Sequence, residues 1–239
     1  MKIINKILDY SKTPFILAAI IFICSLVLLS IFKTAETQLN NLNNAMIIAN
    51  EMSDSSDDLT NYARYYVTTK DEQWKKRFEN IIKIRNGEEA NKDNVKISFK
   101  DKVKAFEFST NELDLILKSE TLSNNLAILE VKAFDSIKAG KIEQNWDVQQ
   151  FHYTQAQIFM FGEDYTKHKN EIMNTIDKFT KTVYARLEHD YQISMKLAWL
   201  LITIINISLI ILVISVQHHN KTILMSSTKV STSKRKVKG

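Results

Sequence analysis

The residues most suited to ligand chemistry are an arginine and three tyrosines that lie close together in the sequence. Arg64 stands among Tyr62, Tyr65 and Tyr66. A planar guanidinium can hold a carboxylate through two parallel hydrogen bonds, and aromatic rings can enclose a small ligand. These residues therefore predict a pocket for an organic acid or an amino acid between helices. The alternative is an internal ion pair, in which Glu130 or a nearby acid neutralises Arg64.

Arg85, in the run IKIRNG, allows the same two interpretations and one more, because a cation near a helix end is favoured by the helix dipole. We treat Arg85 and Glu130, with Arg64 and the three tyrosines, as candidate ligand-binding residues. The sequence evidence for a metal site is weaker than that for a ligand pocket. His168 has ligand-like spacing to Asp164 and Glu171, but such pairs arise by chance on a highly charged helix. We predict no metal site and no cofactor.

The sequence has no pattern typical of an enzyme's active site. A phosphate-binding G-x-x-x-x-G-K-[ST] motif is absent, and four glycines are too few for a dinucleotide-binding fingerprint. No nucleophile stands with a base in a recognisable pattern. Cys24 is the single cysteine, which excludes an intramolecular disulfide and a cysteine-based zinc site. We therefore expect no enzyme activity and no catalytic residues.

The composition favours long helices. The chain of 239 residues is 45% hydrophobic and 25% charged, yet it contains only four glycines and one proline. Sheet-rich folds need many turns, and turns draw on these two residue types. The sequence therefore predicts an all-α fold.

Two stretches predict membrane-spanning helices. Residues 14–32 and 197–216 contain no charged side chain, and about twenty residues of helix cover the hydrocarbon thickness of a bilayer. Buried helices of a soluble protein are the alternative. The first stretch also resembles a signal peptide, but it is longer than a typical signal core and lacks a small-x-small cleavage pattern. We predict two uncleaved spans.

The distribution of charge predicts the orientation. Residues before the first span carry a net charge of +2, Lys33 adds +1, and the tail after residue 216 carries +6. Residues 34–196 hold 22 basic and 26 acidic side chains, a net charge of −4. Because basic ends stay in the cytoplasm, we expect residues 1–13 and 217–239 inside and 33–196 in the periplasm. The pI near 9 then results from the basic segments that flank the two spans, and we expect no nucleic-acid partner.

The first exported segment predicts a helix over residues 34–69. Apolar residues recur there at steps of three and four, and only the run SDSSDD at 53–58 interrupts them. The expected buried positions are Leu39, Leu42, Met46, Ala49, Met52, Leu59, Ala63 and Val67.

Capping patterns predict the other helices. Thr69 with Glu72 has capping-box spacing for a helix that ends at Asn86–Gly87, with Trp74 and Phe78 in the core, and residues 88–97 read as a loop. Ser109 with Glu112 predicts a second box, and that helix should stop near Gly140. A short helix around 147–161 and a last helix from Glu163 complete an up-down-up-down four-helix bundle.

Three segments carry a resemblance to a known family. Residues 56–87 resemble the ligand-binding region of a group of bacterial methyl-accepting chemotaxis receptors, through Ser-Asp-Asp-Leu-Thr, Ala-Arg-x-Tyr-Val-x-Thr and Ile-Arg-Asn-Gly. Related sensor kinases and diguanylate cyclases carry similar regions. Residues 122–134 and 161–179 are also similar, so the likeness covers most of residues 35–196. The resemblance implies a periplasmic four-helix sensor domain that is usually dimeric.

The sequence departs from this family in two places. EEANKDN replaces the Pro-rich stretch that often follows Ile-Arg-Asn-Gly, and the tail of residues 221–239 is too short for a helical relay module (HAMP), signalling hairpin, kinase or cyclase. We therefore expect a chemoreceptor-like sensor that signals through a full-length receptor or kinase in trans. Asn206 in the second span favours a homodimer. The alternatives are a non-sensing scaffold and the truncated front end of a longer receptor.

Overall fold

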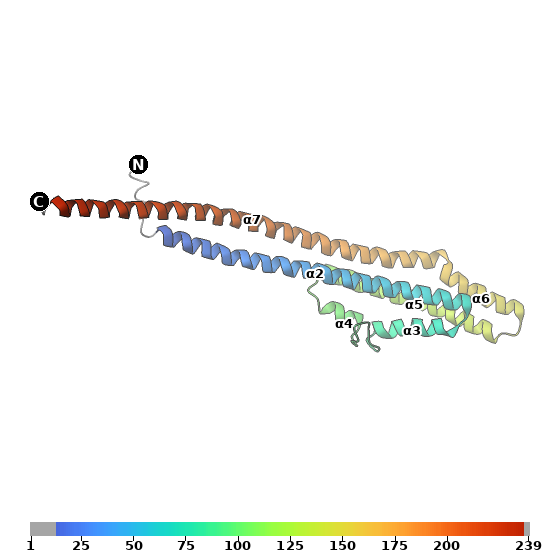
Figure 1. The fold of residues 1–239 in the computed structure, drawn as a ribbon. Helices are drawn as coiled ribbons and strands as arrows, with labels where there is room; N and C mark the ends of the chain where they lie inside the picture. Colours follow the sequence, from blue (N-terminus) through green and yellow to red (C-terminus); the bar gives the residue numbers. More distant parts are fainter. Residues whose placement is uncertain (1–12, 237–239) are drawn as a thin grey trace. The chain divides into compact units, whose positions relative to one another are not determined.

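The computed structural model describes residues 13–236, and the secondary structure in this range is helical. The helices are α2 (Thr13–Thr69), α3 (Glu72–Arg85), α4 (Phe99–Lys104), α5 (Thr110–Ile142), α6 (Trp146–Phe161) and α7 (Glu163–Lys236) (Figure 1). Residues 13–236 contain no strand, which confirms the predicted all-α fold. The predicted cytoplasmic ends fall partly on residues 1–12 and 237–239, which lie outside the described residues.

Two helices carry stretches that are long and apolar enough to cross a membrane. The most apolar window has a mean hydropathy of 3.0 in α2 and 2.8 in the stretch that ends at Gln217. Large apolar side chains project from them unburied, with Phe15 78% and Ile210 61% exposed. Such side chains are unfavourable in water and favourable in lipid. The two helices therefore indicate membrane association, as residues 14–32 and 197–216 predict.

Two polar side chains in these stretches bond to their own helices. Ser25 donates to the carbonyl of Ile21 at 2.7 Å, and the amide of Asn206 donates to the carbonyl of Ile202 at 2.9 Å. The sequence interpretation gave Asn206 a bond to a second helix. In the structure its Nδ2 donates to a carbonyl of α7 itself, and the homodimer stays a prediction.

The chain divides into two compact units, one formed by Leu39–Glu188 and the other by Met1–Gln38 with His189–Gly239. The unit Leu39–Glu188, called the central unit below, has one hydrophobic core that takes buried side chains from all six helices. Within it, α5 and α6 pack side by side in opposite directions (Figure 1). Phe78 lies in this core, and Trp74 packs partly buried against it.

The buried face of α2 differs from the prediction at its beginning. Leu39 and Met46 are 66% and 40% exposed, whereas Ala45 and Ile48 are buried. From Ala49 onward the predicted positions are buried as expected: Ala49, Met52, Leu59, Ala63 and Val67. The polar run does not interrupt this face, because the small side chain of Ser56 fills the buried position between Met52 and Leu59.

One predicted helix cap is wrong and the other is confirmed. α2 continues through Thr69, so Asp71 caps α3 instead, and its side chain accepts from the amide of Gln73 at 3.0 Å. The box at α5 is present, with Ser109 and Glu112 bonded in both directions. The complete box at α5 is visible in the local sequence. Thr69 does not cap α3 because it is the last residue of α2, where its hydroxyl donates to the carbonyl of Tyr65 at 2.7 Å.

Two further features were not predicted. α4 is only six residues long, too short for a periodic pattern, and Ser98 caps it by accepting from the amide of Asp101. α5 also continues past Gly140 to Ile142. A Cβ at Gly140 would stand 2.5 Å from the ring of Tyr153 on α6, so this glycine allows the two helices to approach instead of ending the helix.

Glu112 makes the best-satisfied buried charge pair of the central unit. Its side chain is fully buried and accepts from Arg186 Nε at 2.7 Å, from Arg186 Nη2 at 2.9 Å and from the amide of Ser109 at 2.8 Å. Burial raises the pKa of Glu112, but the hydrogen bonds from Arg186 and Ser109 lower it by more, so the carboxyl is held below its ordinary pKa.

We predict that Glu112→Gln lowers the free energy of unfolding by about 2 kcal/mol, because a neutral amide at the fully buried position 112 replaces the two charge-assisted hydrogen bonds to Arg186 with weaker ones. Denaturant titration of the full-length protein in detergent micelles measures this. Asp114→Asn is the control, since Asp114 is exposed on the same helix. Equal effects of the two substitutions would refute the structural role of Glu112.

Candidate ligand pocket

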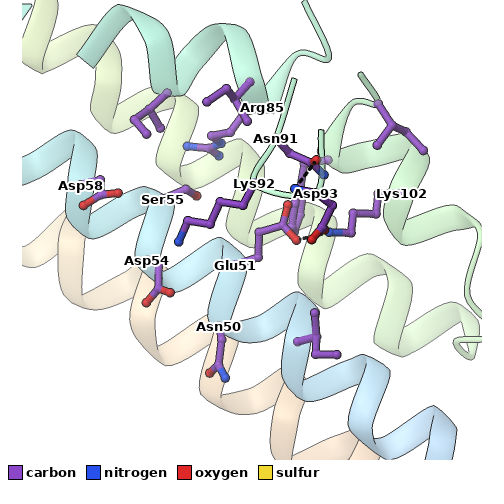
Figure 2. Close-up of a pocket in the computed structure, with 15 residues that line it drawn as sticks. Asn50, Glu51, Asp54, Ser55, Asp58, Arg85, Asn91, Lys92, Asp93 and Lys102 are labelled. Atoms are coloured by element: carbon purple, nitrogen blue, oxygen red, sulfur yellow. Dashed lines mark hydrogen bonds and ion pairs between the residues drawn. The ribbon is translucent and has the colours of Figure 1, made fainter. Parts of the chain in front are cut away.

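A pocket of about 350 Å³ lies in the central unit, where α2, the C-terminal end of α3, the segment after α3 and the start of α4 meet (Figure 2). Its polar lining includes Glu51, Asp54 and Asp58 from α2 and Arg85 from α3. Apolar side chains complete it: Ile47, Ile81, Ile84, Ile97 and Phe99. The pocket therefore combines an apolar interior with charges of both signs.

Arg85 is the unusual residue of this pocket. It is the last residue of α3 and only 6% exposed. Nη1 donates to Ser123 Oγ at 2.9 Å, and Nη2 has long contacts of 3.5 Å to the carbonyl of Glu120 and 3.7 Å to Met52 Sδ. Its Nε has no partner.

No carboxylate forms an ion pair with Arg85 in the described part of the chain. Burial lowers the pKa of Arg85, and the charges of Glu120 and Glu130 only partly oppose this effect. A buried guanidinium of this kind is costly unless a negative group meets it. Arg85 is thus a buried cation without a direct anionic partner in the described residues.

The acidic wall of the pocket comes from one face of α2. Glu51, Asp54 and Asp58 are spaced by three and four residues, which places their side chains one above another. Glu51 pairs with Lys102 of α4. Asp54 and Asp58 form no ion pair within residues 13–236. Partial burial raises the pKa of Asp58, and the charges of Asp54 and Asp57 raise it further, against the opposing effect of Lys92.

The segment after α3 forms one side of the pocket and is held in place by hydrogen bonds within the segment. Residues 88–97 form no helix, as predicted. Gly87 has a φ of 76°, and a Cβ there would stand 2.6 Å from the amide of Ser98, so only glycine fits this turn. Asn91 Oδ1 accepts from the amides of Asp93 and Val95, each at 3.0 Å. These bonds hold Lys92 and Asp93 against the pocket (Figure 2).

Of the six candidate residues from the sequence, only Arg85 lines this pocket. Arg64 Nε donates to the carbonyl of Met160 at 3.4 Å, and its guanidinium lies over the rings of Phe161 and Tyr165 at 5.1 and 5.4 Å. It forms no ion pair with Glu130 within residues 13–236. The alternative of a direct ion pair between Arg64 and Glu130 is therefore not observed, and the guanidinium contacts a carbonyl and two rings instead.

The three tyrosines do not form one cavity wall. Tyr62 and Tyr65 pack on Trp74, with ring centroids 6.0 and 4.7 Å away. Tyr66 is buried edge-on against Phe134, and its hydroxyl donates to Glu72 at 3.1 Å. Adjacent helical positions point about 100° apart, so neighbouring tyrosines cannot all face one ligand.

Glu130 lies in a separate buried network. It is 1% exposed, and the Tyr165 hydroxyl lies 2.5 Å from its carboxyl and 2.9 Å from Thr60 Oγ1. Thr60 in turn donates to the carbonyl of Ser56 at 3.1 Å. A hydroxyl has one proton to donate. All three bonds are therefore made at once only if Glu130 carries a proton and donates to Tyr165, Tyr165 donates to Thr60, and Thr60 donates to Ser56.

Burial raises the pKa of Glu130 to about 7. The hydrogen bond from Tyr165 opposes the shift, as do the more distant charges of Lys169, Arg85 and Arg64. Sequence reasoning found Glu130 but missed the network, because Tyr165 and Thr60 come from helices distant in the sequence.

Among residues 13–236, no group of three or more His, Cys, Asp or Glu side chains is arranged to hold a metal ion. Trp74, which packs on the tyrosines, and Phe78, which packs edge-on against Phe134, serve the core and not the pocket. No family model, curated protein or solved structure matches the chain. The interpretation of the pocket therefore rests on its own chemistry.

We predict that stability falls with rising pH because of Glu130. Its pKa is raised on folding from the ordinary 4.5 to about 7, so the folded state binds the proton more tightly than the unfolded state. The contribution is complete below pH 4.5, decreases as the pH rises, and is lost above about pH 7. The expected loss is about 3 kcal/mol.

The measurement is the free energy of unfolding of the full-length protein in micelles between pH 4.5 and 8. Glu130→Gln should remove this pH-dependent loss, and Asp135→Asn, an exposed acid on the same helix, should keep it. A Glu130→Gln variant with the wild-type pH profile would show that Glu130 does not hold the proton.

Proposed function

We propose that this chain is a membrane-anchored sensor. The central unit lies in the periplasm as a four-helix bundle and binds a small solute. The two apolar helices anchor it in the inner membrane, with both chain ends in the cytoplasm. The observation that carries the proposal is Arg85, a buried guanidinium that faces a pocket and has no carboxylate partner.

The binding of a solute is supported by the cost of burying Arg85. In a stable core pair such as Glu112 and Arg186, each charge meets its counterpart directly. Arg85 meets only a serine, a thioether and a distant carbonyl. A ligand carboxylate would supply the missing acceptors, and its binding would stabilise the bundle.

The orientation is supported by the charge distribution. Residues 34–196 carry a net charge of −4, whereas the segments before the first apolar stretch and after the second are basic. Lys- and Arg-rich flanks favour the cytoplasmic side. The resemblance of residues 56–87, 122–134 and 161–179 to chemotaxis-receptor sensor regions agrees with this placement.

The path of the signal follows from helix continuity. α2 and α7 each run as one unbroken helix from the central unit into an apolar stretch. A small sliding or rotation of either helix on ligand binding can therefore reach the cytoplasm. The protein acts as a homodimer, and a full-length receptor or kinase supplies the output in trans.

A non-sensing scaffold is the second candidate, and one observation favours it. α6 exposes a row of large apolar side chains, with Trp146, Phe151, Ile158 and Phe161 between 53% and 69% exposed. Exposed apolar patches mark protein interaction sites. This alternative predicts a partner protein and no dependence on a solute.

The sensor proposal is tested by a thermal-stability screen of the full-length protein in micelles against small carboxylates, amines and zwitterions. A ligand at 100 times its dissociation constant should stabilise the protein by about 2.7 kcal/mol. Arg85→Gln should abolish the ligand response, and Arg85→Lys should weaken it because an ammonium lacks the guanidinium fork.

The matched control is Lys76→Gln, an exposed cation on the same helix as Arg85, which should keep the full response. Two results would contradict the proposal. Either no compound stabilises the wild-type protein, or Arg85→Gln responds as strongly as the wild type.

A further inference from the structure

Charges of both signs line the pocket, and most of the acidic ones stand on α2. Arg85 is the most deeply buried of them, whereas the unpaired carboxylates Asp54 and Asp58 stand on α2 (Figure 2). An acidic pair on a helix face is ordinarily solvated and does not define a site. Here it shares a pocket with a guanidinium that is 6% exposed and whose Nε has no partner. The two observations together describe a cavity with a cationic and an anionic end.

The two ends do not neutralise each other. Arg85 forms no ion pair with Asp54 or Asp58 in the described residues. The carboxylates that act on the charge of Arg85 are Glu120 and Glu130, and neither lines the pocket. Asp58 is influenced by Lys92, Asp54 and Asp57. Arg85 therefore makes no direct contact with either carboxylate, and much of the remaining lining is apolar.

We propose that the pocket binds a small zwitterion whose carboxylate and ammonium groups stand at opposite ends of a short apolar chain, as in an ω-amino acid. Arg85 holds the carboxylate, and Asp54 and Asp58 hold the ammonium. This inference rests on the proposed sensor function and names the class of solute that the same pocket takes.

Each group of such a ligand has a complementary group in the lining of the pocket. When the Arg85 side chain turns toward the pocket, a carboxylate can accept from Nε and one terminal nitrogen in parallel, which satisfies the buried nitrogen that lacks a partner. An ammonium between Asp54 and Asp58 relieves the repulsion of two carboxylates one helical turn apart. A methylene chain contacts the isoleucines of the lining, including Ile81 and Ile84.

Lys92 is the cation that a ligand ammonium would displace. It is an exposed residue of the segment after α3, it lines the pocket, and it makes no ion pair within residues 13–236. Its charge nonetheless lowers the pKa of Asp58. Lys92 therefore competes with an ammonium but would assist a second carboxylate, and its removal distinguishes the two ligand classes.

Other simple ligands fit less well. An α-amino acid carries its ammonium and carboxylate groups on the same carbon atom, so it cannot reach both ends of the pocket. A dicarboxylate places one negative group beside Asp54 and Asp58, and a diamine places one positive group beside Arg85. Like charges at such distances are unfavourable, so each of these compounds should bind more weakly than the ω-amino acid of equal length.

The experiment is calorimetric titration of the full-length protein in micelles with matched compounds. The ω-amino acids from 4-aminobutanoate to 6-aminohexanoate are compared with the α-amino acid, dicarboxylate and diamine of the same carbon number. At least one ω-amino acid should bind about tenfold more tightly than each of its matched compounds, since one charge-assisted contact is worth about that factor.

Variants assign the two ends. Asp54→Asn with Asp58→Asn should weaken the ω-amino acid about tenfold and leave the affinity for a plain monocarboxylate of the same length unchanged. Asp57→Asn is the matched control, because Asp57 pairs with Lys169 at 2.7 Å and does not line the pocket. Lys92→Gln should tighten binding of the ω-amino acid.

The outcomes separate this inference from the proposed function. If a dicarboxylate binds best through Arg85 and Lys92→Gln weakens it, the zwitterion inference is overturned while the sensor pocket stands. If an α-amino acid or a diamine binds best, the inference is likewise overturned. If no compound binds, or Arg85→Gln leaves every affinity unchanged, both the inference and the proposed function fail.

Discussion

The rest of the structure depends on two long apolar stretches whose exposed side chains favour lipid over water. Their phenylalanines, leucines and isoleucines project outward, so water would penalise these surfaces heavily. A helix is the element that satisfies its own backbone in lipid, which explains why α2 and α7 are unbroken and why Ser25 and Asn206 bond within their own helices.

The central unit handles three buried charged groups in three different ways. Glu112 is ionised and meets Arg186 and a backbone amide, which contributes to stability. Glu130 has its pKa raised to about 7 and can complete a chain of hydrogen bonds through Tyr165 when it is protonated. Arg85 contacts no carboxylate, and its guanidinium lacks a full set of hydrogen-bond acceptors. Of the three groups, only Arg85 lacks a matched partner, and the sensor proposal rests on this difference.

The sequence predicted what depends on composition and local spacing. The all-α fold, the two apolar helices, the Ser109–Glu112 box and the loop at 88–97 follow from neighbouring residues alone. The site was predicted less well. Arg64 stands among aromatic residues in the sequence, yet its contacts are Met160, Phe161 and Tyr165, nearly a hundred residues away. Arg85 lies in the pocket because the segment beyond Gly87 folds back toward α2. No local sequence pattern predicts the direction of this segment.

The most direct test of the account is the side of the membrane on which the central unit lies. In a Cys24→Ser background, spheroplasts carrying either Asn61→Cys, at an exposed position of α2, or Ser231→Cys, in the basic tail, are treated with a membrane-impermeant maleimide. The account predicts labelling of the Asn61→Cys protein in intact spheroplasts and of the Ser231→Cys protein only after lysis. Labelling of Asn61→Cys only after lysis would place the pocket in the cytoplasm and contradict the account.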